Sequence, residues 1–463
     1  MIIRALSSFA VPYYTLLPTL PHFVLLDHNI PKSEMIDEEW RYFAPSGGIC
    51  PGGPSTWHIL DWDQRRIIAV TMDEEQESED LAIEHLKKHI DALAPDVYAI
   101  HLSPDGELTS VSTDPEDDVT ICEYHPPLEA IQVPGDIKTV VRSDLLELDR
   151  LGPNVDLVSY TPCAHAAEKK VVFKYYFIFQ FIHRRWHEMN LWMRLPSHPN
   201  IVPIDRLVLD ELRGGFVGFT SLYIPGGTVW ENTERVFKLN WLRQLTLVID
   251  DLNLKYGIAH QDVAARNLLV NPETDDLMLF DFNWSGRIGV PILGGLGYIK
   301  DRDDVKGVIF TLYEIITRDT HFQSVRCDLQ NPDDVMGLEE WVQHPDVKLD
   351  HPVSEYRSVL NEWVKKRREG KQIAIYTEAP EYIDWPPFPN PLPTDEISGA
   401  PHGEFNVVPG VPPCNMRRCD REKGIEVLNW QRPAQNTLGN GGRLLANGQF
   451  ARRKECVSAA GPK

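Results

Sequence analysis

The stretch Gly257–Gly286, GIAHQDVAARNLLVNPETDDLMLFDFNWSG, constrains the fold of this 463-residue chain more than any other part of the sequence. It places His260, Asp262 and Asn267 in a tight loop. Two short apolar runs, LLV and LMLF, then predict a small β-pair that ends at Asp281. The segment therefore brings two carboxylates and one amide together beside a hairpin.

Two acids and an amide in this order are typical of a site for nucleotide-dependent phosphoryl transfer. Asp281 and Asn267 offer hard oxygen ligands to a Mg²⁺ ion that bridges phosphate groups. Asp262 is then expected to face the acceptor hydroxyl, as a base or an orienting group. His260 has a plainer interpretation as a packed core histidine, and we assign it no proton transfer.

The charge of the chain limits how it can hold a phosphate. The sequence has 46 Lys and Arg residues against 68 Asp and Glu residues, which gives a formal net charge of −22. Such a chain repels polyanions, so we expect neither nucleic acid nor a membrane surface as a partner. Any phosphate must be held by a local site. No stretch reaches the roughly 18 apolar residues that a membrane-spanning helix needs.

The sequence HQDVAARNLLV resembles the H-R-D-L-A-A-R-N-L-L-V catalytic loop of eukaryotic protein kinases, and FDFN resembles their D-F-G element. Other segments are similar to kinase segments in the same order: VVFK, SHPNIVPI, SLYIPGGTV and RDDVKGVIFTLYEIIT. The resemblance covers about residues 145–370, roughly half of the chain. It is to a divergent kinase of the kind found among fungal kinase-like proteins.

The resemblance implies that Lys174, in VVFK, anchors the phosphates of ATP and that Glu188 on the next helix is its partner. The residues agree with this interpretation. Lys174 lies mid-strand among bulky apolar residues, where an unpaired ammonium is costly. Glu188 follows the helical spacing of Leu191 and Leu195, so it faces the same way as that apolar stripe. The alternatives are a lysine reaching to the surface and a solvated glutamate.

The same resemblance implies a set of contacts to the adenine base. The backbone of Leu222 and Ile224 would meet its edge, with Ser221 at the gatekeeper position and Leu269 beneath the ring. Asp304, at the beginning of RDDVKGVIF, would be the buried aspartate that braces the catalytic loop. The implied cofactors are ATP and Mg²⁺.

Four departures from the kinase pattern weaken the expectation of activity. The glycine loop has only Leu151–Asn154 as a counterpart, although its glycines normally let backbone N–H groups approach phosphate. The H-R-D arginine is Gln261, which removes the usual partner of an activation-loop phosphate. The D-F-G glycine is Asn283. No A-P-E follows between Asp281 and Asp303, and this weakens the case for a peptide substrate.

We expect an α+β chain with a bilobal protein-kinase-like fold. The expected parts are a small α/β accessory unit over residues 1–135, a β-rich N-lobe over 140–225, a helical C-lobe over 226–376 and a Pro/Gly-rich, mostly disordered tail over 377–463. At the N-terminus, Pro12, Pro18 and Pro21 interrupt an apolar run. We interpret it as the beginning of a folded or docked segment, with a secretory signal as the alternative.

The accessory unit shows ordinary α/β patterning. Strands are expected over 65–72 and 97–102, with a helix over 78–93 between them. The turn sequence SPDG predicts that residues 107–111 return as a hairpin partner. The glycine-rich GGICPGGPST lacks the Lys-Ser/Thr and the preceding strand of a phosphate loop, so we interpret it as a plain loop.

Seven scattered cysteines do not form the pattern of a disulfide-stapled secreted domain, so we expect a cytoplasmic protein, with the nucleus as an alternative. Cys414 and Cys419 have loose metal-ligand spacing without a second pair, and two free thiols are the favoured interpretation.

Three functions remain open at this stage. The first is an ATP- and Mg²⁺-dependent protein kinase that acts on a Ser, Thr or Tyr hydroxyl of a protein partner. The second is a pseudokinase that binds nucleotide or works as a scaffold, which the degenerate glycine loop and missing A-P-E favour. The third is a small-molecule kinase, since H-x-D-x4-N followed by D-F also suits aminoglycoside- and choline-kinase-like enzymes. Against the third, three segments favour the protein-kinase branch: HPNIV, SLYIPGGTV, which resembles the kinase hinge, and the helix that begins near Asp304.

Overall fold

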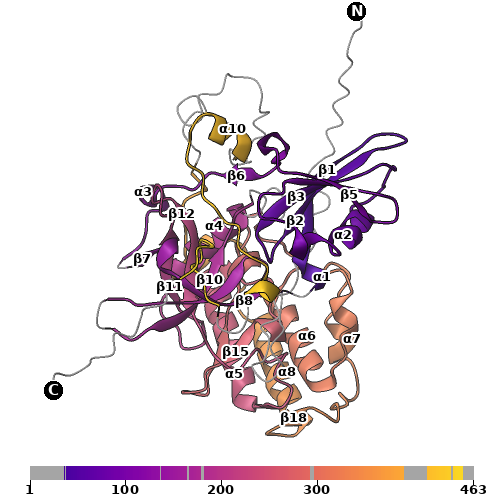
Figure 1. Cartoon of the computed structure of the whole chain (residues 1–463). Helices are drawn as coiled ribbons and strands as arrows, with labels where there is room; N and C mark the ends of the chain where they lie inside the picture. The colour runs from indigo at the N-terminus through magenta and orange to yellow at the C-terminus, as the bar shows by residue number, and fades with distance from the viewer. Residues whose placement is uncertain are drawn as a thin grey trace, which may run out of the picture.

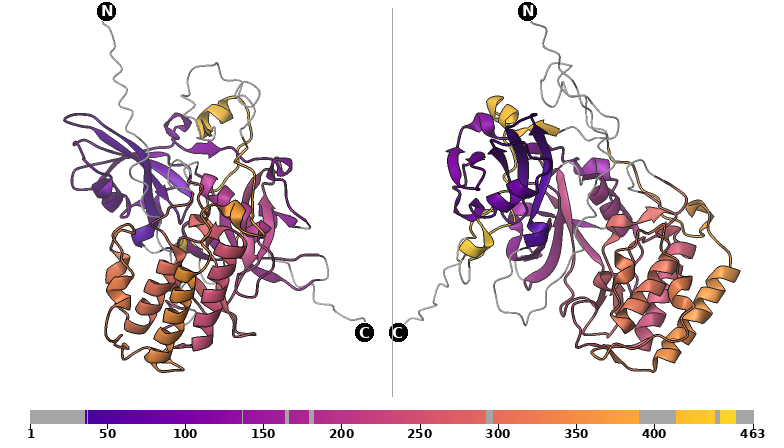
Figure 2. Two further views of the ribbon diagram at one scale, coloured as in Figure 1. Left: turned by 180° about the vertical axis from the view of Figure 1, so that it is seen from behind. Right: turned by 90° about the vertical axis from the view of Figure 1, so that its right-hand side faces the viewer.

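The computed structural model describes residue 36 and residues 38–135, 137–163, 166–178, 182–291, 297–389, 414–438 and 442–451. The expected N-terminal segment or signal lies outside these residues. The expected mixture of helices and sheets is confirmed. Figures 1 and 2 show an N-terminal sheet unit in indigo, a central sheet in magenta and a mostly helical part in orange. No helix in the described ranges is long and apolar enough to span a membrane.

The N-terminal unit is a five-stranded sheet in the order β1-β2-β3-β4-β5. Its elements are α1 (Glu38–Arg41), β1 (Tyr42–Ile49), β2 (Ser55–Asp61), β3 (Arg66–Met72), α2 (Asp80–Leu86), β4 (Ala99–Leu102) and β5 (Leu108–Ser112). Strands β3 and β4 are parallel and α2 connects them, whereas β4 and β5 form the antiparallel pair that SPDG predicts. The predicted helix is shorter than expected, because its last turns tighten into 3₁₀ geometry over Ile90–Ala92.

The interpretation of GGICPGGPST as a plain loop is wrong at both of its ends. Gly47 and Gly48 belong to β1, where they pair with Trp57 and Thr56 of β2. A Cβ on Gly47 would lie 2.4 Å from the ring of Trp57, so this strand position needs glycine for packing. The glycines therefore belong to a β-hairpin, and only its turn is irregular.

The central sheet has six strands in the order β7-β11-β12-β10-β9-β8. They are β7 (Lys138–Val141), β8 (Leu146–Gly152), β9 (Val155–Tyr160), β10 (Lys169–Tyr175), β11 (Ile204–Leu209) and β12 (Phe216–Leu222). The helix expected to carry Glu188 is α4 (Ile182–Arg194), which follows β10 and precedes β11 in the chain. Trp192 of α4 packs against Phe219 of β12 with ring centroids 5.7 Å apart, so helix and sheet share one core.

Beyond β12 the chain is mostly helical. The larger elements are α5 (Leu239–Asp250), α6 (Asp304–Thr317), α7 (Asp333–Met336) and α8 (Val353–Glu369). A π-helical turn at Asp251–Lys255 continues α5. Short strand pairs lie between the helices: β13 (Val236–Phe237) with β18 (Lys348–Leu349), β14 (Ile258–Ala259) with β17 (Gly286–Arg287), and β15 (Leu268–Val270) with β16 (Leu277–Leu279). The last pair is the hairpin that the sequence predicts before Asp281.

The prediction of a disordered tail is wrong for residues 414–438 and 442–451. Strand β19 (Cys414–Met416) pairs with β6 (Ile121–Glu123). In the chain, α3 (Leu128–Ile131) comes after β6, and α10 (Arg417–Glu422) comes directly after β19. Further on, Leu445 bridges to Leu146 of β8. Figure 1 shows this yellow segment crossing from the N-terminal unit to the central sheet.

The tail is ordered because it docks onto surfaces that other segments build, and so it needs no core of its own. Trp430 stacks on Tyr175 at 5.4 Å, and the guanidinium of Arg142 lies 4.3 Å from the Trp430 ring. Arg432 is buried and donates to Glu147 at 3.1 Å and to Asp156 at 3.0 Å. Composition alone missed this, because it measures what a segment can bury by itself.

Candidate active site

Lys174 lies at the centre of the candidate site. Antiparallel pairing holds it mid-strand in β10, opposite Phe219 on one side and Val155 on the other. Its Nζ donates to Glu188 Oε1 at 2.5 Å and also contacts the carboxylate of Asp281. All three side chains are at least 96% buried. One ammonium therefore joins the central sheet, α4 and the segment that follows β16.

Arg185 adds a second cation to this group. Its Nη1 donates to Glu188 Oε2 at 2.5 Å, one helical turn away on α4. Its Nη2 contacts the side-chain oxygen of Asn154. Sequence reasoning missed Arg185, although the i, i+3 spacing from Glu188 was a signal for such a pair.

Asn154 belongs to the turn between β8 and β9, where the sequence has its only counterpart of a glycine loop. The turn is short, because β8 ends at Gly152 and β9 begins at Val155. Asn154 takes the left-handed conformation with φ 53°, and its carbonyl accepts from Tyr175 at 3.1 Å. Arg185 thus connects this turn to the Lys174–Glu188 pair.

The electrostatics of the two carboxylates differ. Burial raises the pKa of Glu188, but the charges of Lys174 and Arg185 outweigh it and hold that pKa below its ordinary value. Burial also raises the pKa of Asp281, and there it prevails over Lys174, with help from the nearby charges of Glu188 and Asp262. Of the two carboxylates, Asp281 is therefore the one whose buried negative charge is not fully compensated by nearby cations.

Asp262 and Asn267 are held together in the loop before β15. Asn267 Nδ2 donates at 2.8 Å both to the Asp262 carbonyl and to Asp262 Oδ2. Arg266 donates to Asp262 Oδ1 at 2.6 Å. The Asp262 side chain is 13% exposed, so solvent reaches it while its geometry stays fixed.

The β15–β16 hairpin places Asn267 close to the segment that carries Asp281. Phe280 N–H donates to the Asn267 carbonyl at 3.2 Å, directly before Asp281. Asp281 has a left-handed backbone with φ 65°, and its Oδ2 accepts from Asn283 Nδ2 at 3.1 Å. Asn283 thus interacts with Asp281 in place of a glycine.

Asp304 holds the backbone of the loop that begins at His260, as the kinase resemblance implies. It is 3% exposed, and its carboxylate accepts from the backbone N–H groups of His260 at 2.7 Å and Gln261 at 2.6 Å. His260 is fully buried, and its Nε2 donates to the Phe280 carbonyl at 3.1 Å. Asp262 N–H donates to Nδ1 of the same ring at 3.3 Å, so both ring nitrogens of His260 are used to hold the loop together.

Gln261 binds the backbone of the segment after Asp281. Its Nε2 donates to the carbonyls of Trp284 at 2.6 Å and Gly297 at 3.0 Å, and its Oε1 accepts from Ile299 N–H at 2.6 Å. Trp284 in turn lies under the guanidinium of Arg302, 3.9 Å from its ring centroid. The Gln261 side chain therefore holds Trp284, Gly297 and Ile299 together by direct hydrogen bonds.

An apolar pocket opens beside Lys174 and encloses about 460 Å³ of atom-free space, its open mouth included. Its lining residues come from the central sheet and the β15–β16 hairpin: Val155, Val172, Lys174, Val202, Ser221, Leu222, Tyr223, Ile224, Leu269 and Phe280. Leu222, Ile224, Leu269 and Ser221 therefore line one space together with Lys174.

The backbone of the pocket wall differs between Leu222 and Ile224, which both line it. Leu222 N–H is engaged by the Pro203 carbonyl, whereas Ile224 makes no backbone hydrogen bond within the ranges that the structure describes. Ile224 lines the pocket and is only 9% exposed. A ligand that both donates and accepts hydrogen bonds would find unused partners in its backbone N–H and C=O.

Asp281 and Asn267 are the residues that could hold a divalent metal together with phosphate oxygens. Within the described ranges, no group of three His, Cys, Asp or Glu side chains is placed to hold a metal by itself. Two protein ligands suffice for Mg²⁺ where phosphates supply others.

A search of known protein-family profiles finds none that matches the chain.

Proposed function

We propose that this chain is an ATP- and Mg²⁺-dependent phosphotransferase of the protein-kinase type, which moves the γ-phosphate of ATP to a polypeptide hydroxyl. The observation that carries the proposal is the position of Lys174. It lies between Glu188 and Asp281 at the end of an apolar pocket, with Asp262 and Asn267 on the adjoining loop. A sheet followed by a mostly helical part agrees with a bilobal kinase fold.

Each residue has a role in this proposal. Lys174 binds the α- and β-phosphates, and Glu188 orients its ammonium. Bound Mg²⁺ would neutralise charge on the phosphates, with Asp281 and Asn267 as its protein ligands. Asp262 accepts a hydrogen bond from the acceptor hydroxyl and holds that oxygen in line with the phosphate.

The main alternative is a nucleotide-binding or scaffolding protein that transfers nothing. Two observations favour it. The turn at Asn154 offers no run of glycines to approach phosphate, and its side chain is occupied by Arg185. In addition, Lys174 is already shared by two carboxylates. The five described free cysteines, Cys50, Cys122, Cys163, Cys327 and Cys419, agree with an intracellular location in either case.

A thermal-shift titration with Mg-ATP, followed by a transfer assay, tests the proposal. A nucleotide at about 100 times its Kd stabilises a folded protein by about 2.7 kcal/mol. We expect such stabilisation in the wild type and in Asp262→Asn, together with loss of transfer in that variant only. Asp301→Asn, an exposed acid of the same part, is the matched control.

The outcomes separate the alternatives. Stabilisation without transfer to any protein acceptor, amino alcohol or aminoglycoside would favour the scaffold. Transfer only to the small molecules would favour a small-molecule kinase. Full transfer by Asp262→Asn would overturn the role proposed for this aspartate.

A further inference from the structure

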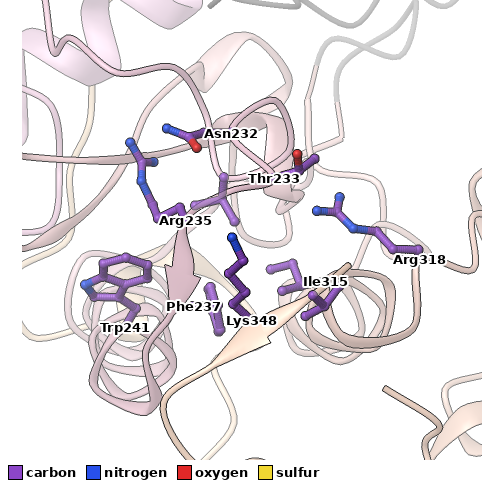
Figure 3. Close-up of a pocket in the computed structure, with 10 residues that line it drawn as sticks. Asn232, Thr233, Arg235, Phe237, Trp241, Ile315, Arg318 and Lys348 are labelled. Atoms are coloured by element: carbon purple, nitrogen blue, oxygen red, sulfur yellow. The ribbon is translucent and has the colours of Figure 1, made fainter. Parts of the chain in front are cut away.

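A second pocket lies in the helical part, lined by Thr233, Arg235, Trp241, Arg318 and Lys348 among others (Figure 3). It encloses about 290 Å³ of atom-free space, open to solvent on one side. Three of its side chains are cations, although the whole chain carries a net charge of −22. The lining thus has three basic side chains and no acidic one.

Backbone contacts fix the positions of these cations. Arg318 caps α6 in a left-handed conformation with φ 59°, and its N–H donates to Glu314 at 2.9 Å. Lys348 belongs to β18, which pairs in parallel with β13 directly after Arg235. His344 N–H donates to the Ile316 carbonyl at 2.9 Å, which ties the segment before β18 to α6. The main chain that carries these cations is therefore held in place from both sides.

Arg318 is the cation with unused hydrogen-bonding capacity. Its guanidinium packs 5.7 Å from the ring of Trp230, and it donates no hydrogen bond within the described part of the chain. Burial lowers its pKa, opposed by the charge of Asp346. Figure 3 shows its guanidinium and the ammonium of Lys348 directed toward the space next to Thr233.

Two acidic side chains lie near these cations: the charge of Asp346 acts on Arg318, and Glu234 contacts Lys348. Lys348 contacts Glu234, whose side chain is 85% exposed. An exposed pair of this kind is worth little and exchanges readily with another anion. Arg235 donates to the Gly226 carbonyl at 2.9 Å, so it forms part of the wall. A negatively charged group in the pocket would gain Arg318 and Lys348 as partners.

The pocket is connected to the catalytic loop through α6. Thr311 donates to the Val263 carbonyl at 2.9 Å, next to Asp262. Arg318 follows seven positions later on α6, which corresponds to about 10 Å along a helix that rises 1.5 Å per residue. An extended peptide covers this distance in about three residues. On the other side of the pocket, Val229 N–H donates to Leu268 of β15 at 2.8 Å.

We propose that this pocket binds an acidic side chain, carboxylate or phosphorylated, of the acceptor polypeptide, about three residues from the hydroxyl that is phosphorylated. That the bound polypeptide is a phosphoryl acceptor rests on the proposed function, whereas the binding of an acidic side chain does not. Arg318 and Lys348 hold the acid, and Thr233 adds a hydroxyl at the rim.

Binding tests the pocket without any phosphoryl transfer. The probes are fluorescein-labelled Gly/Ala peptides with one serine and with Asp, phosphoserine or Asn three residues before or after it, measured by anisotropy. We expect the Asp peptide of one register to bind about tenfold more tightly than its Asn counterpart, as one charged hydrogen bond implies. Phosphoserine, which carries a larger negative charge than Asp, should bind more tightly still.

Arg318→Gln and Lys348→Gln should remove the preference for Asp and phosphoserine over Asn. Arg326→Gln, an arginine whose side chain is 74% exposed, should retain it. Unchanged melting temperatures show that the variants are folded. Equal binding of all three peptides by the wild type, or an unchanged preference in Arg318→Gln, would overturn the proposal.

Transfer kinetics then separate this proposal from the proposed function. With active enzyme, kcat/KM should favour the Asp peptide about tenfold over the Asn peptide, and Arg318→Gln should abolish that ratio. Equal kcat/KM for both peptides would reject the acidic pocket and leave the kinase in place. Tight, Arg318-dependent binding without transfer would support the pocket and reject the kinase.

Discussion

Lys174 contacts Asp281 directly, although 107 positions separate them in the chain, and it shares its ammonium with Glu188. Two buried carboxylates thus depend on a single lysine, with Arg185 as an additional partner of Glu188 only. Removal of the lysine would leave Asp281 without a cationic side chain in hydrogen-bond contact among the described residues.

Lys174→Met is therefore expected to destabilise the protein as well as to abolish nucleotide binding. Removing one partner of a buried pair typically costs about 3–5 kcal/mol, because the other charge remains buried. Chemical denaturation measures the loss. Lys170→Met, on the same strand but exposed, is the control and should behave like the wild type. A Lys174→Met protein as stable as the control would show that the lysine does not compensate these carboxylates.

The Mg²⁺ affinity of the site should rise with pH. Burial raises the pKa of Asp281, so the folded protein holds a proton there in a pH range where the unfolded chain has lost it. In that range, stability without metal falls as the pH rises, whereas Mg²⁺ binding improves because it needs the ionised carboxylate. Thermal-shift titrations with Mg-ATP between about pH 5 and pH 8 measure both effects.

Asp281→Asn isolates this carboxylate. Asn tolerates the left-handed backbone at φ 65°. We expect the variant without metal to be as stable as the wild type or about 1 kcal/mol more stable, since a poorly compensated buried charge is removed. Its stabilisation by Mg-ATP should be lost. Asp275→Asn, an exposed residue with φ 62°, controls for the substitution. Persistent Mg²⁺-dependent stabilisation in Asp281→Asn would rule out a ligand role.

Gln261→Asn should loosen the segment that follows Asp281. Asn retains the amide and tolerates the positive φ of 65°, but it is one methylene too short to reach Trp284, Gly297 and Ile299. Loss of a hydrogen bond of about 1 kcal/mol implies roughly fivefold faster amide exchange. Hydrogen-exchange mass spectrometry over residues 297–302 measures it. Gln330→Asn, at a residue whose side chain donates to the Phe322 carbonyl, should leave this peptide unchanged.

The sequence was sufficient to predict features that local patterns encode. The hairpin before Asp281 and helix α4 follow from short-range spacing, and both occur as expected. The contact of Asp304 with the loop backbone was implied by the kinase resemblance alone, and it occurs too. The convergence of Lys174, Glu188 and Asp281 needed the order of several motifs, because no local pattern relates residues so far apart. Their proposed roles stay predictions.

Long-range docking of polar residues was not predictable in this way. Arg432 lies in a Pro-, Gly- and Asn-rich tail whose composition indicates disorder, yet it is buried against Glu147 and Asp156, more than 270 positions away. An isolated arginine carries no sequence signal for such a partner. The basic pocket around Arg318 escaped notice for the same reason, since its cations come from separate elements.

Arg432→Met should detach the tail from the central sheet. Arg432, Arg150 and Arg65 surround Glu147. Burial raises the pKa of Glu147, but these charges outweigh it and lower the pKa to about 2. The stability that Glu147 contributes is therefore complete above its unfolded value of about 4.5 and is lost as the pH falls from there toward 2. Loss of Arg432 leaves Glu147 and Asp156 with less positive charge.

We expect Arg432→Met to lower stability by about 3–5 kcal/mol at neutral pH and to shift acid unfolding to higher pH, since Glu147 then protonates more readily. Acid titration followed by circular dichroism measures the shift, and limited proteolysis reports release of residues 442–451. Arg443→Met, which replaces an exposed arginine of the same tail, is the control. Identical acid unfolding in the two variants would mean that Arg432 does not hold the tail, and that β19 and the Trp430 contacts are sufficient to order it.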